Sequence, residues 1–207
     1  MKRFVKIFSL VIVSFLLIFI GVKYSIKYLA KEIITESRFH EIINEIELTP
    51  SIPKSFKTTY RLIYPDIFEN NFNSTLWNQI TGKSIKSCPC KWAVEIRPDI
   101  SIQIKSRFNL LIFKLGFIWS LEDKFSQEKC FEFYLQNLDF LFSTRGINQA
   151  SKKYYNKPLY SLDIEEQLGL ILMINNPSYY NKFRFPENHQ SGIEEFKRLI
   201  ILNNQNQ

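Results

Sequence analysis

Hydrophobic residues in this chain recur mostly at the spacing of helices. Between residues 31 and 48, apolar side chains share one helical face, which predicts a helix or helical stalk: Ile33, Ile34, Ile42, Ile43 and Ile46. The sequence "TPSIPKSF" at 49–56 breaks this pattern. The stretch from Pro53 to about Ile100 mixes Asn, Pro, Ser and aromatic residues, and predicts short helices joined by loops.

The second half of the chain carries further helical patterns. Residues 108–121, "FNLLIFKLGFIWSL", contain one charge, Lys114, and predict either a buried core helix or a helix lying against a membrane. Ser126 opens the next predicted helix, whose apolar positions are Phe131, Leu135, Leu138 and Phe142. A short helix is predicted within 145–155, with Ile147, Ala150 and Tyr154 on one face.

Two capping signals mark the last predicted helices. Asp163 and Glu166 have the spacing of a capping box before an apolar stripe, and the sequence "NNP" at 175–177 ends that helix. Ser191 and Glu194 repeat the spacing before "IEEFKRLIIL". The fold class predicted from these patterns is mainly α.

The N-terminal stretch predicts a membrane anchor. Residues 7–22 carry no charge and follow the basic residues Lys2, Arg3 and Lys6. No cleavage site of the A-x-A kind follows promptly, so we favour an uncleaved anchor over a cleaved signal peptide. Lys23, Lys27 and Lys31 lie just beyond the run and nearly balance the leading basic residues. The usual outcome for such a leading anchor places the remaining chain outside the inner membrane.

The charge distribution argues against nucleic-acid binding. The net charge is +7, but six of the 27 basic residues lie within residues 1–31, which contain no acidic residue. The remainder is therefore almost neutral, whereas binding to a nucleic acid needs a basic excess on the folded part. A basic flank beside an anchor is instead attracted to anionic lipid headgroups.

The cysteines leave two interpretations open. Cys88 and Cys90 are too close in sequence to bridge each other without strain, and Cys130 lies far along the chain. One interpretation is a disulfide from Cys88 or Cys90 to another segment, or a metal site. The favoured one is ordinary half-buried thiols, because a zinc site needs about four ligands and only His40 and His189 are available to complete it.

Residues 121–181 resemble the membrane-anchored peptidoglycan glycosyltransferase domain of family 51, which occurs in bifunctional penicillin-binding proteins and monofunctional transglycosylases. The shared pattern runs from an L-E pair through Y-L and G-I to a closing P-S-x-Y-N. The family-motif residues to which we assign structural roles are Glu122, Tyr134, Leu135, Gly146, Ile147, Glu166 and Pro177. No gap is needed to align the two patterns.

The resemblance implies a lysozyme-like helical glycosyltransferase domain behind an N-terminal transmembrane helix. The implied organisation is an anchor at 1–31, a helical stalk at 32–52 and a family-51-like domain at 53–207. The implied partners are the membrane, lipid II or a peptidoglycan strand, and proteins of cell-wall synthesis. The family's chemistry uses a carboxylate as general base, and basic side chains or a divalent cation to stabilise the departing pyrophosphate. No other cofactor and no protein metal site are predicted.

The sequence departs from the family where the chemistry is expected. Aligning 52–68 with the family's first motif puts Tyr64 at the position of the general base. Lys114 occupies the position of the second glutamate, eight residues before Glu122. Glu69 is the fallback carboxylate if the first alignment shifts. The family's glycine-rich turn is replaced by 141–143, "LFS". No catalytic residue is therefore assigned with confidence.

The pair Glu122 and Asp123 imitates the missing acidic motif in the wrong part of the chain, and we interpret it as a solvated or helix-capping pair. Basic residues that are candidates for binding phosphate or lipid headgroups, with a solvated or snorkelling role as the alternative, are Lys105, Arg107, Lys114 and Lys124.

Three functional hypotheses follow. The first is an active peptidoglycan glycosyltransferase that acts on lipid II and whose acidic residues come from positions other than those aligned above. The second, which we favour for the chemistry, is a degenerate relative that has lost the usual catalytic glutamates and serves as a non-catalytic scaffold or binding protein for lipid II, nascent glycan or a partner of the cell-wall machinery. The third is an unrelated membrane-tethered helical scaffold.

Overall fold

A computed structural model of the chain describes residues 2–83, 86–97 and 103–205, and side chains from residue 6 onward except that of residue 204. Within these ranges the secondary structure is helical, without strands, and one isolated antiparallel bridge joins Asp139 and Arg145. The mainly α prediction is confirmed. The predicted end of the irregular stretch near Ile100 lies outside the described residues.

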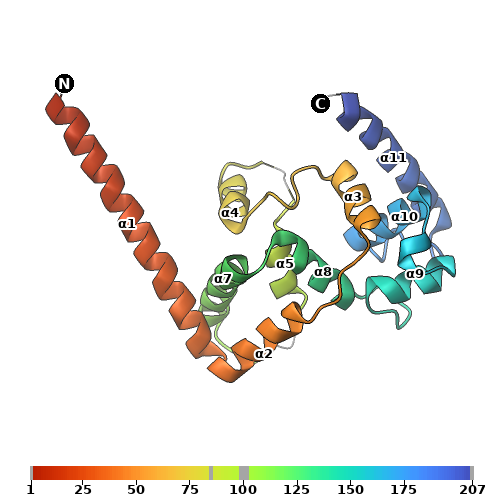
Figure 1. Ribbon diagram of the computed structural model, residues 1–207, viewed down its shortest axis with the longest axis horizontal. Coiled ribbons are helices and arrows are strands. Elements are labelled where there is room, and N and C mark those ends of the chain that lie inside the picture. Colours follow the sequence, from red (N-terminus) through yellow and green to blue (C-terminus); the bar gives the residue numbers. More distant parts are fainter. Residues whose placement is uncertain (1, 84–85, 98–102, 206–207) are drawn as a thin grey trace. The chain divides into compact units, whose positions relative to one another are not determined.

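The helices belong to two compact units (Figure 1). Unit 1 comprises residues 1–44 and 97–124, and unit 2 comprises residues 45–96 and 125–207. The helices of unit 1 are α1 (Lys2–Ile33), α2 (Glu36–Glu47), whose last turn is counted with unit 2, and α7 (Arg107–Lys124). The elements of unit 2 are α3 (Lys54–Ile63), α4 (Phe72–Ile80), α5 (Pro89–Glu95), α8 (Gln127–Asn137), α9 (Ile147–Tyr155), the 3-10 helix η1 (Leu159–Ser161), α10 (Ile164–Asn175) and α11 (Pro186–Gln205).

In unit 1, the C-terminal part of α1 packs closely on α7. Gly116 makes this approach feasible, because a Cβ atom there would lie 2.5 Å from the Ile26 carbonyl oxygen and 2.6 Å from the Ala30 Cβ atom. The apolar residues of α7 that face the interior of the unit include Phe113 and Phe117, whose rings stack at 5.2 Å. The predicted helix over 108–121 therefore buries one face within unit 1, while Phe108 and Leu111 stay exposed.

The N-terminal part of α1 is apolar around its whole circumference. The large apolar side chains between Ile7 and Ile20 are 44–70% exposed. The segment Lys6–Ile33 is long and apolar enough to cross a membrane, and among the described helices it alone meets that test. A helix that exposes apolar groups on every side fits lipid better than water.

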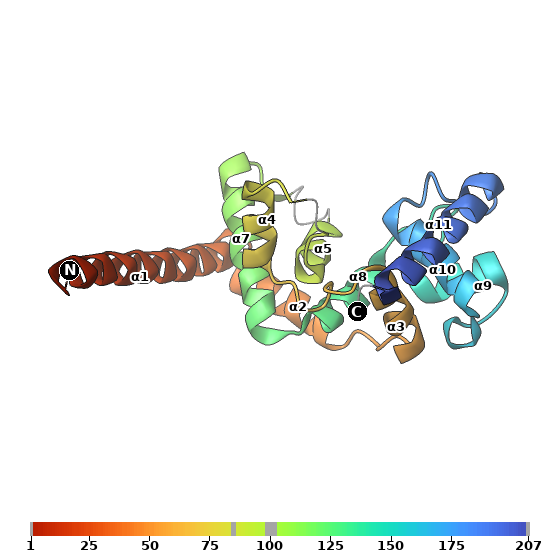
Figure 2. The ribbon, with the colours of Figure 1, turned by 90° about the horizontal axis from the view of Figure 1, so that it is seen from above.

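Unit 2 has a continuous core built from the helical stripes seen in the sequence. Figures 1 and 2 show α3, α9 and α11 gathered around α10. Phe56 and Tyr60 of α3 pack with Phe131 and Leu135 of α8 and with the apolar residues of α10, all almost fully buried. Most predicted core positions of α8, α9 and α10 are therefore confirmed.

Two of the three predicted helix starts are confirmed. The Ser126 hydroxyl accepts a hydrogen bond from the Lys129 backbone amide at the start of α8. Asp163 and Glu166 form both hydrogen bonds of a capping box at α10. The start predicted at Ser191 is wrong, because α11 begins at Pro186, whose missing amide hydrogen is tolerated in a first helical turn.

The predicted extension of α8 to Leu138 and Phe142 is also wrong. The helix ends at Asn137, and Phe142 lies 55% exposed on the following loop. At 141–143 three successive residues adopt φ values of 70°, 51° and 56°. This left-handed conformation favours glycine and costs other residues roughly 1–2 kcal/mol each. The loop thus keeps a glycine-like turn, although the family's glycines are absent.

A disulfide joins Cys90 of α5 to Cys130 of α8, with the two Cα atoms 4.8 Å apart. The favoured expectation of ordinary thiols is therefore wrong for this pair, and the alternative of a bridge to another segment is confirmed. Cys88 forms no disulfide and is buried. The sequence could not identify the pair, because α5 and α8 meet only through tertiary packing.

Candidate functional site

The clearest candidate site in unit 2 is a lysine surrounded by aromatic rings. Lys86 lies just before α5, and its Nζ atom is 3.9 Å from the ring centroid of Tyr64. The same atom lies 5.4 Å from the Tyr60 ring and 5.3 Å from the Trp92 ring. An ammonium group within about 6 Å of aromatic faces gains a cation–π attraction. We call Tyr60, Tyr64, Lys86 and Trp92 the lysine cage.

Helical spacing places the two tyrosines of the cage next to each other. Tyr60 lies in the last turn of α3 and Tyr64 directly follows the helix, so the two residues are one turn apart and their rings lie 5.1 Å apart. Tyr60 is fully buried, whereas Tyr64 is half-buried. Trp92 of α5 supplies the third ring of the cage. The Cys90–Cys130 disulfide attaches α5 to α8 and so limits the movement of Trp92, which lies two residues after Cys90.

Hydrogen bonds fix the polar atoms of the cage. Lys86 Nζ donates to the Tyr60 hydroxyl at 3.0 Å and to Oδ1 of Asn175, the last residue of α10. The Nδ2 atom of Asn175 donates to the Tyr64 hydroxyl at 2.7 Å. One asparagine thus orients both the lysine and the tyrosine.

Two small cavities adjoin Lys86. The first, of about 360 Å³, is lined by Tyr60, Lys86, Ser87, Trp92, Tyr134, Ile174 and Asn175. The second, of about 200 Å³, is lined by Ile63, Tyr64, Pro65, Asp66, Ile67, Asn70 and Lys86. Aromatic faces together with a cation and amide groups suit a sugar that carries a negative charge.

Burial shifts the pKa values of Lys86 and Tyr64 in the directions that favour the neutral form of each side chain. Burial lowers the pKa of Lys86 to about 8. Burial raises the pKa of Tyr64, although the hydrogen bond from Asn175 acts in the opposite direction. Tyr64 therefore keeps its proton at neutral pH, while Lys86 is still mostly charged there.

The lowered pKa of Lys86 predicts a pH dependence of stability. Between pH 8 and 10 the unfolded chain keeps the Lys86 proton that the folded chain has released, so the free energy of unfolding should rise with pH, by up to about 2 kcal/mol. In Lys86→Met this rise should disappear. Urea unfolding of detergent-solubilised protein at several pH values, followed by tryptophan fluorescence, measures the difference. Equal pH profiles for the two proteins would contradict the assignment.

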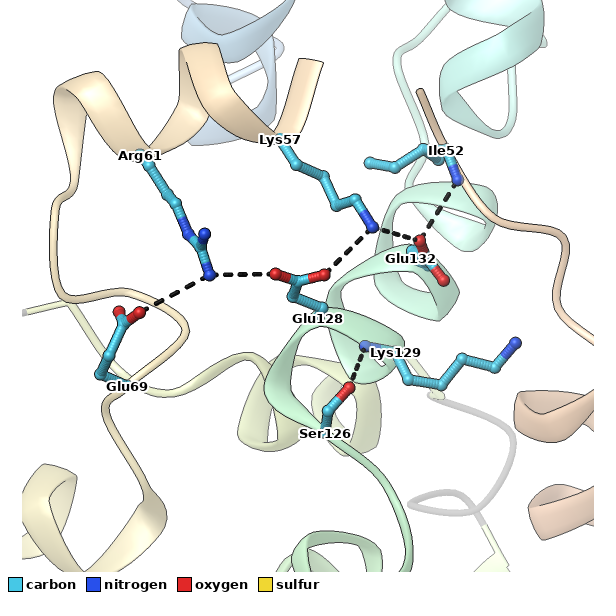
Figure 3. A network of polar contacts seen from close by, with 8 residues as sticks. All are labelled: Ile52, Lys57, Arg61, Glu69, Ser126, Glu128, Lys129 and Glu132. Atoms are coloured by element: carbon cyan, nitrogen blue, oxygen red, sulfur yellow. Dashed lines mark hydrogen bonds and ion pairs between the residues drawn. The ribbon is translucent and has the colours of Figure 1, made fainter. Parts of the chain in front are cut away.

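The fallback carboxylate Glu69 does not line either cavity. It pairs with Arg61 at 3.6 Å, and Arg61 also contacts Glu128 of α8 at 3.0 Å (Figure 3). The acidic residue that does line a cavity beside Lys86 is Asp66, which lies two residues after Tyr64 and is exposed. Asp66 is not among the candidate residues expected from the sequence.

The ion pairs of Arg61 with Glu69 and Glu128 are part of a larger network, which we call the Figure 3 network. Lys57 extends this network into the core of unit 2. Its Nζ atom lies 3.1 Å from both Glu128 and Glu132. Glu132 is 3% exposed and also accepts the Ile52 backbone amide at 3.3 Å. Hydrogen bonds with Glu132 and Glu128 raise the pKa of Lys57 despite the opposing effect of burial. The network attaches α3 and the residues before it to α8. We therefore interpret Glu128 and Glu132 as structural residues and not as catalytic carboxylates.

The other predicted site residues are divided between the units. In unit 1, α7 contains Arg107, Lys114, Glu122 and Lys124, and Lys105 precedes it. Unit 2 contains Tyr64 and Glu69, so the two expected catalytic positions, Tyr64 and Lys114, belong to different units.

The family-motif residues of unit 2 support the fold around the cage. Tyr134 lines the larger cavity, and burial raises its pKa to about 12. Leu135 and Ile147 are fully buried, and Gly146 has a φ of 88°. Glu166 pairs with Lys157 at 2.7 Å. Pro177 follows α10 in the turn that leads to Tyr180.

Sequence reasoning missed Lys86 and Trp92. Neither residue lies in the segment that carries the family resemblance. The cage and its Asn175 partner come from positions between 60 and 175 in the sequence, which meet only when the chain folds. No cluster of three or more His, Cys, Asp or Glu side chains that could hold a metal occurs among the described residues.

Comparisons with known proteins point to one family. Residues 114–204 match the family model described as Transglycosylase. "Penicillin-binding protein 4" of Bacillus subtilis is 29% identical over 90 residues, which are 44% of this chain and 14% of the relative. "Biosynthetic peptidoglycan transglycosylase" of Methylobacillus flagellatus is 35% identical over 66 residues, covering 32% of this chain and 29% of the relative.

A protein of the same description from Acinetobacter baumannii is 26% identical over 83 residues, covering 40% of this chain and 35% of the relative. The chain thus spans about a third or less of the length of these curated relatives. The family model begins at Lys114, so Tyr64 and Lys86 lie outside the matched segment. The chain is a divergent relative of the peptidoglycan transglycosylases, with the shared segment at residues 114–204.

Proposed function

We propose that this chain is a membrane-tethered protein of cell-wall synthesis that binds lipid II or nascent glycan without polymerising it. The observation that carries this proposal is the lysine cage. Tyr64, which we propose to occupy the position of the family's general base, supplies a phenol instead of a carboxylate and is held by Asn175 beside Lys86.

A phenol in this environment is a poor general base. Catalysis of glycosyl transfer requires a group that accepts the proton of the acceptor hydroxyl near neutral pH. Because burial raises the pKa of Tyr64, its hydroxyl stays protonated there. At the second family position, Lys114 offers a cation instead of a carboxylate. Neither group can perform the expected proton transfer.

The cage retains groups that can bind a charged glycan. The half-buried rings of Trp92 and Tyr134 beside the larger cavity are the candidates for sugar stacking. Lys86 offers a charge-assisted hydrogen bond to a carboxylate or phosphate of the ligand. The proposed ligand, an anionic amino-sugar glycan or its lipid-linked precursor, has both features.

The proposed location is the bacterial inner membrane, with a single pass by α1 and the remaining chain outside. The apolar segment Lys6–Ile33 supports the single pass. The Cys90–Cys130 disulfide supports the orientation, because disulfides persist outside the cytosol and are rare within it. The proposed organisation keeps the anchor at 1–31, the stalk at 32–52 and the glycosyltransferase-like domain at 53–207.

Asp66 favours a second candidate function, an active transferase. Asp66 is among the residues that line the same cavity as Tyr64 and Lys86, so an acidic residue does border the site. On this reading Asp66 replaces the missing base. Asp66→Asn would then abolish polymer formation, whereas the binding proposal expects no polymer in either protein.

Binding of fluorescent lipid II to the full chain in nanodiscs tests the proposal. We expect saturable binding that weakens about ten-fold in Lys86→Met, because a charge-assisted contact is lost. Lys83→Met is the matched control, since Lys83 is an exposed lysine three residues away. Absence of binding by the unmodified protein, or equal losses in the two variants, would contradict a glycan site at Lys86.

A further inference from the structure

Unit 1 contains a basic pocket beside the end of the apolar segment of α1. A cavity of about 240 Å³ is lined by Lys27 and Lys31 of α1, by His40 of α2 and by Asp123 and Lys124 of α7, among others. Three lysines thus face one aspartate. We call these five residues the interfacial lysine pocket.

Packing within unit 1 holds the lysines of this pocket in place. Lys27 forms an ion pair with Asp123, and its side chain is 17% exposed. The Nζ atom of Lys31 lies 5.4 Å from the ring centroid of Phe39, which is buried. His40 lies 3.7 Å from Glu36, one turn earlier on α2. The pocket is therefore formed by ordered side chains of three helices.

The position of the pocket along α1 corresponds to the depth of lipid headgroups. A hydrocarbon core about 30 Å thick takes about 20 helical residues, so a segment that enters at Ile7 leaves the core near Ile26, and Lys27 and Lys31 follow within about 8 Å along the helix axis. The headgroup region of each leaflet is roughly 5–8 Å thick.

We propose that the interfacial lysine pocket binds the phosphate of an anionic phospholipid headgroup. Lys27 and Asp123 neutralise each other, so the net positive charge that complements a phosphodiester comes from Lys31 and Lys124. A lipid is favoured over a soluble phosphate because the anchor itself holds the pocket at the depth where lipid phosphates lie. Each lysine near an anionic membrane surface strengthens such binding. This site is separate from the glycan site of unit 2 and does not depend on it.

Native mass spectrometry of the detergent-solubilised full chain tests the site. The probes are phosphatidylglycerol and phosphatidylethanolamine with identical acyl chains. We expect retained phosphatidylglycerol adducts on the unmodified protein, and about ten-fold weaker retention by Lys31→Gln/Lys124→Gln. Lys152→Gln/Lys153→Gln removes two exposed lysines of α9 and should retain the lipid. Lys31→Arg/Lys124→Arg should restore binding, which separates lost charge from misfolding.

Three results would overturn the proposal. Equal retention of both lipids would show that headgroup charge is not recognised. Equal retention by the two double glutamine variants would place the site elsewhere. Displacement of phosphatidylglycerol by millimolar inorganic pyrophosphate would assign the pocket to a soluble polyphosphate instead of a lipid.

Discussion

Replacing Lys57 by Met is expected to destabilise unit 2 by about 3 kcal/mol. The substitution leaves the Glu132 carboxylate, whose side chain is only 4% exposed, with a hydrogen bond from the Ile52 amide and without the lysine charge. Removing one member of a buried ion pair leaves an uncompensated charge, which typically costs about 3–5 kcal/mol. Urea unfolding of the solubilised chain at pH 7 measures the loss.

A matched control is available on the surface of unit 2. Lys197 also contacts two carboxylates, Glu165 and Glu194, but these carboxylate side chains are 56% and 49% exposed, so neither would be left as a buried charge. Lys197→Met should therefore cost much less stability than Lys57→Met. Lys57→Met/Glu132→Leu should recover much of the lost stability, because no buried charge remains. Equal effects of Lys57→Met and Lys197→Met would contradict the structural role of the Figure 3 network.

Removing the disulfide is expected to have an effect of similar size. The Cys90–Cys130 bridge closes a loop of 40 residues, and a bridge of that length contributes about 3–4 kcal/mol in the chain-entropy account. Cys90→Ala/Cys130→Ala should lower the urea midpoint accordingly. The larger cavity beside Lys86 should also loosen, since Trp92 lies two residues after Cys90.

Cys88→Ala provides the control for the loss of a buried sulfur atom. Cys88 is buried but forms no disulfide, so its replacement should cost roughly 1 kcal/mol, as for a small cavity. Thiol labelling of protein taken from cells under acid quench should modify Cys88 only after unfolding and leave Cys90 and Cys130 unmodified. Labelling of all three cysteines would contradict both the bridge and the proposed location outside the cytosol.

The sequence predicts the helices of the second half well because their signals are local. The Asp163–Glu166 capping box and the Ser126 cap each act within one turn, and both form as predicted. The error at Ser191 has a local cause as well. A capping-box spacing also fits the interior of a helix, and Pro186 is a stronger start signal five residues earlier.

The candidate site was less predictable because it depends on contacts between distant segments. Lys86 is one lysine in a loop until folding brings it beside Tyr60, Tyr64 and Asn175. The disulfide pairing was hard to predict for the same reason, because Cys90 and Cys130 are 40 residues apart in the sequence. The alignment did identify Tyr64 as a position of interest, and the cavity beside it adds Asp66, which a carboxylate search guided by the family motif had passed over.

The two proposed sites bind different ligands and lie in different units. The interfacial lysine pocket of unit 1 would hold anionic lipid at the end of the anchor, and the lysine cage of unit 2 would hold a charged glycan. Each has its own variants, Lys31→Gln/Lys124→Gln for the first and Lys86→Met for the second. The failure of one proposal therefore leaves the other testable.

The most direct test of the central claim is a polymerisation assay with purified full-length protein and labelled lipid II. Glycan chains are separated from the precursor by gel electrophoresis after hours of incubation. We expect labelled lipid II to be bound and recovered unchanged, because the residue that we propose in place of the general base is Tyr64, whose phenol keeps its proton at neutral pH. Labelled glycan strands that disappear in Asp66→Asn would contradict this account and identify the protein as an active transferase.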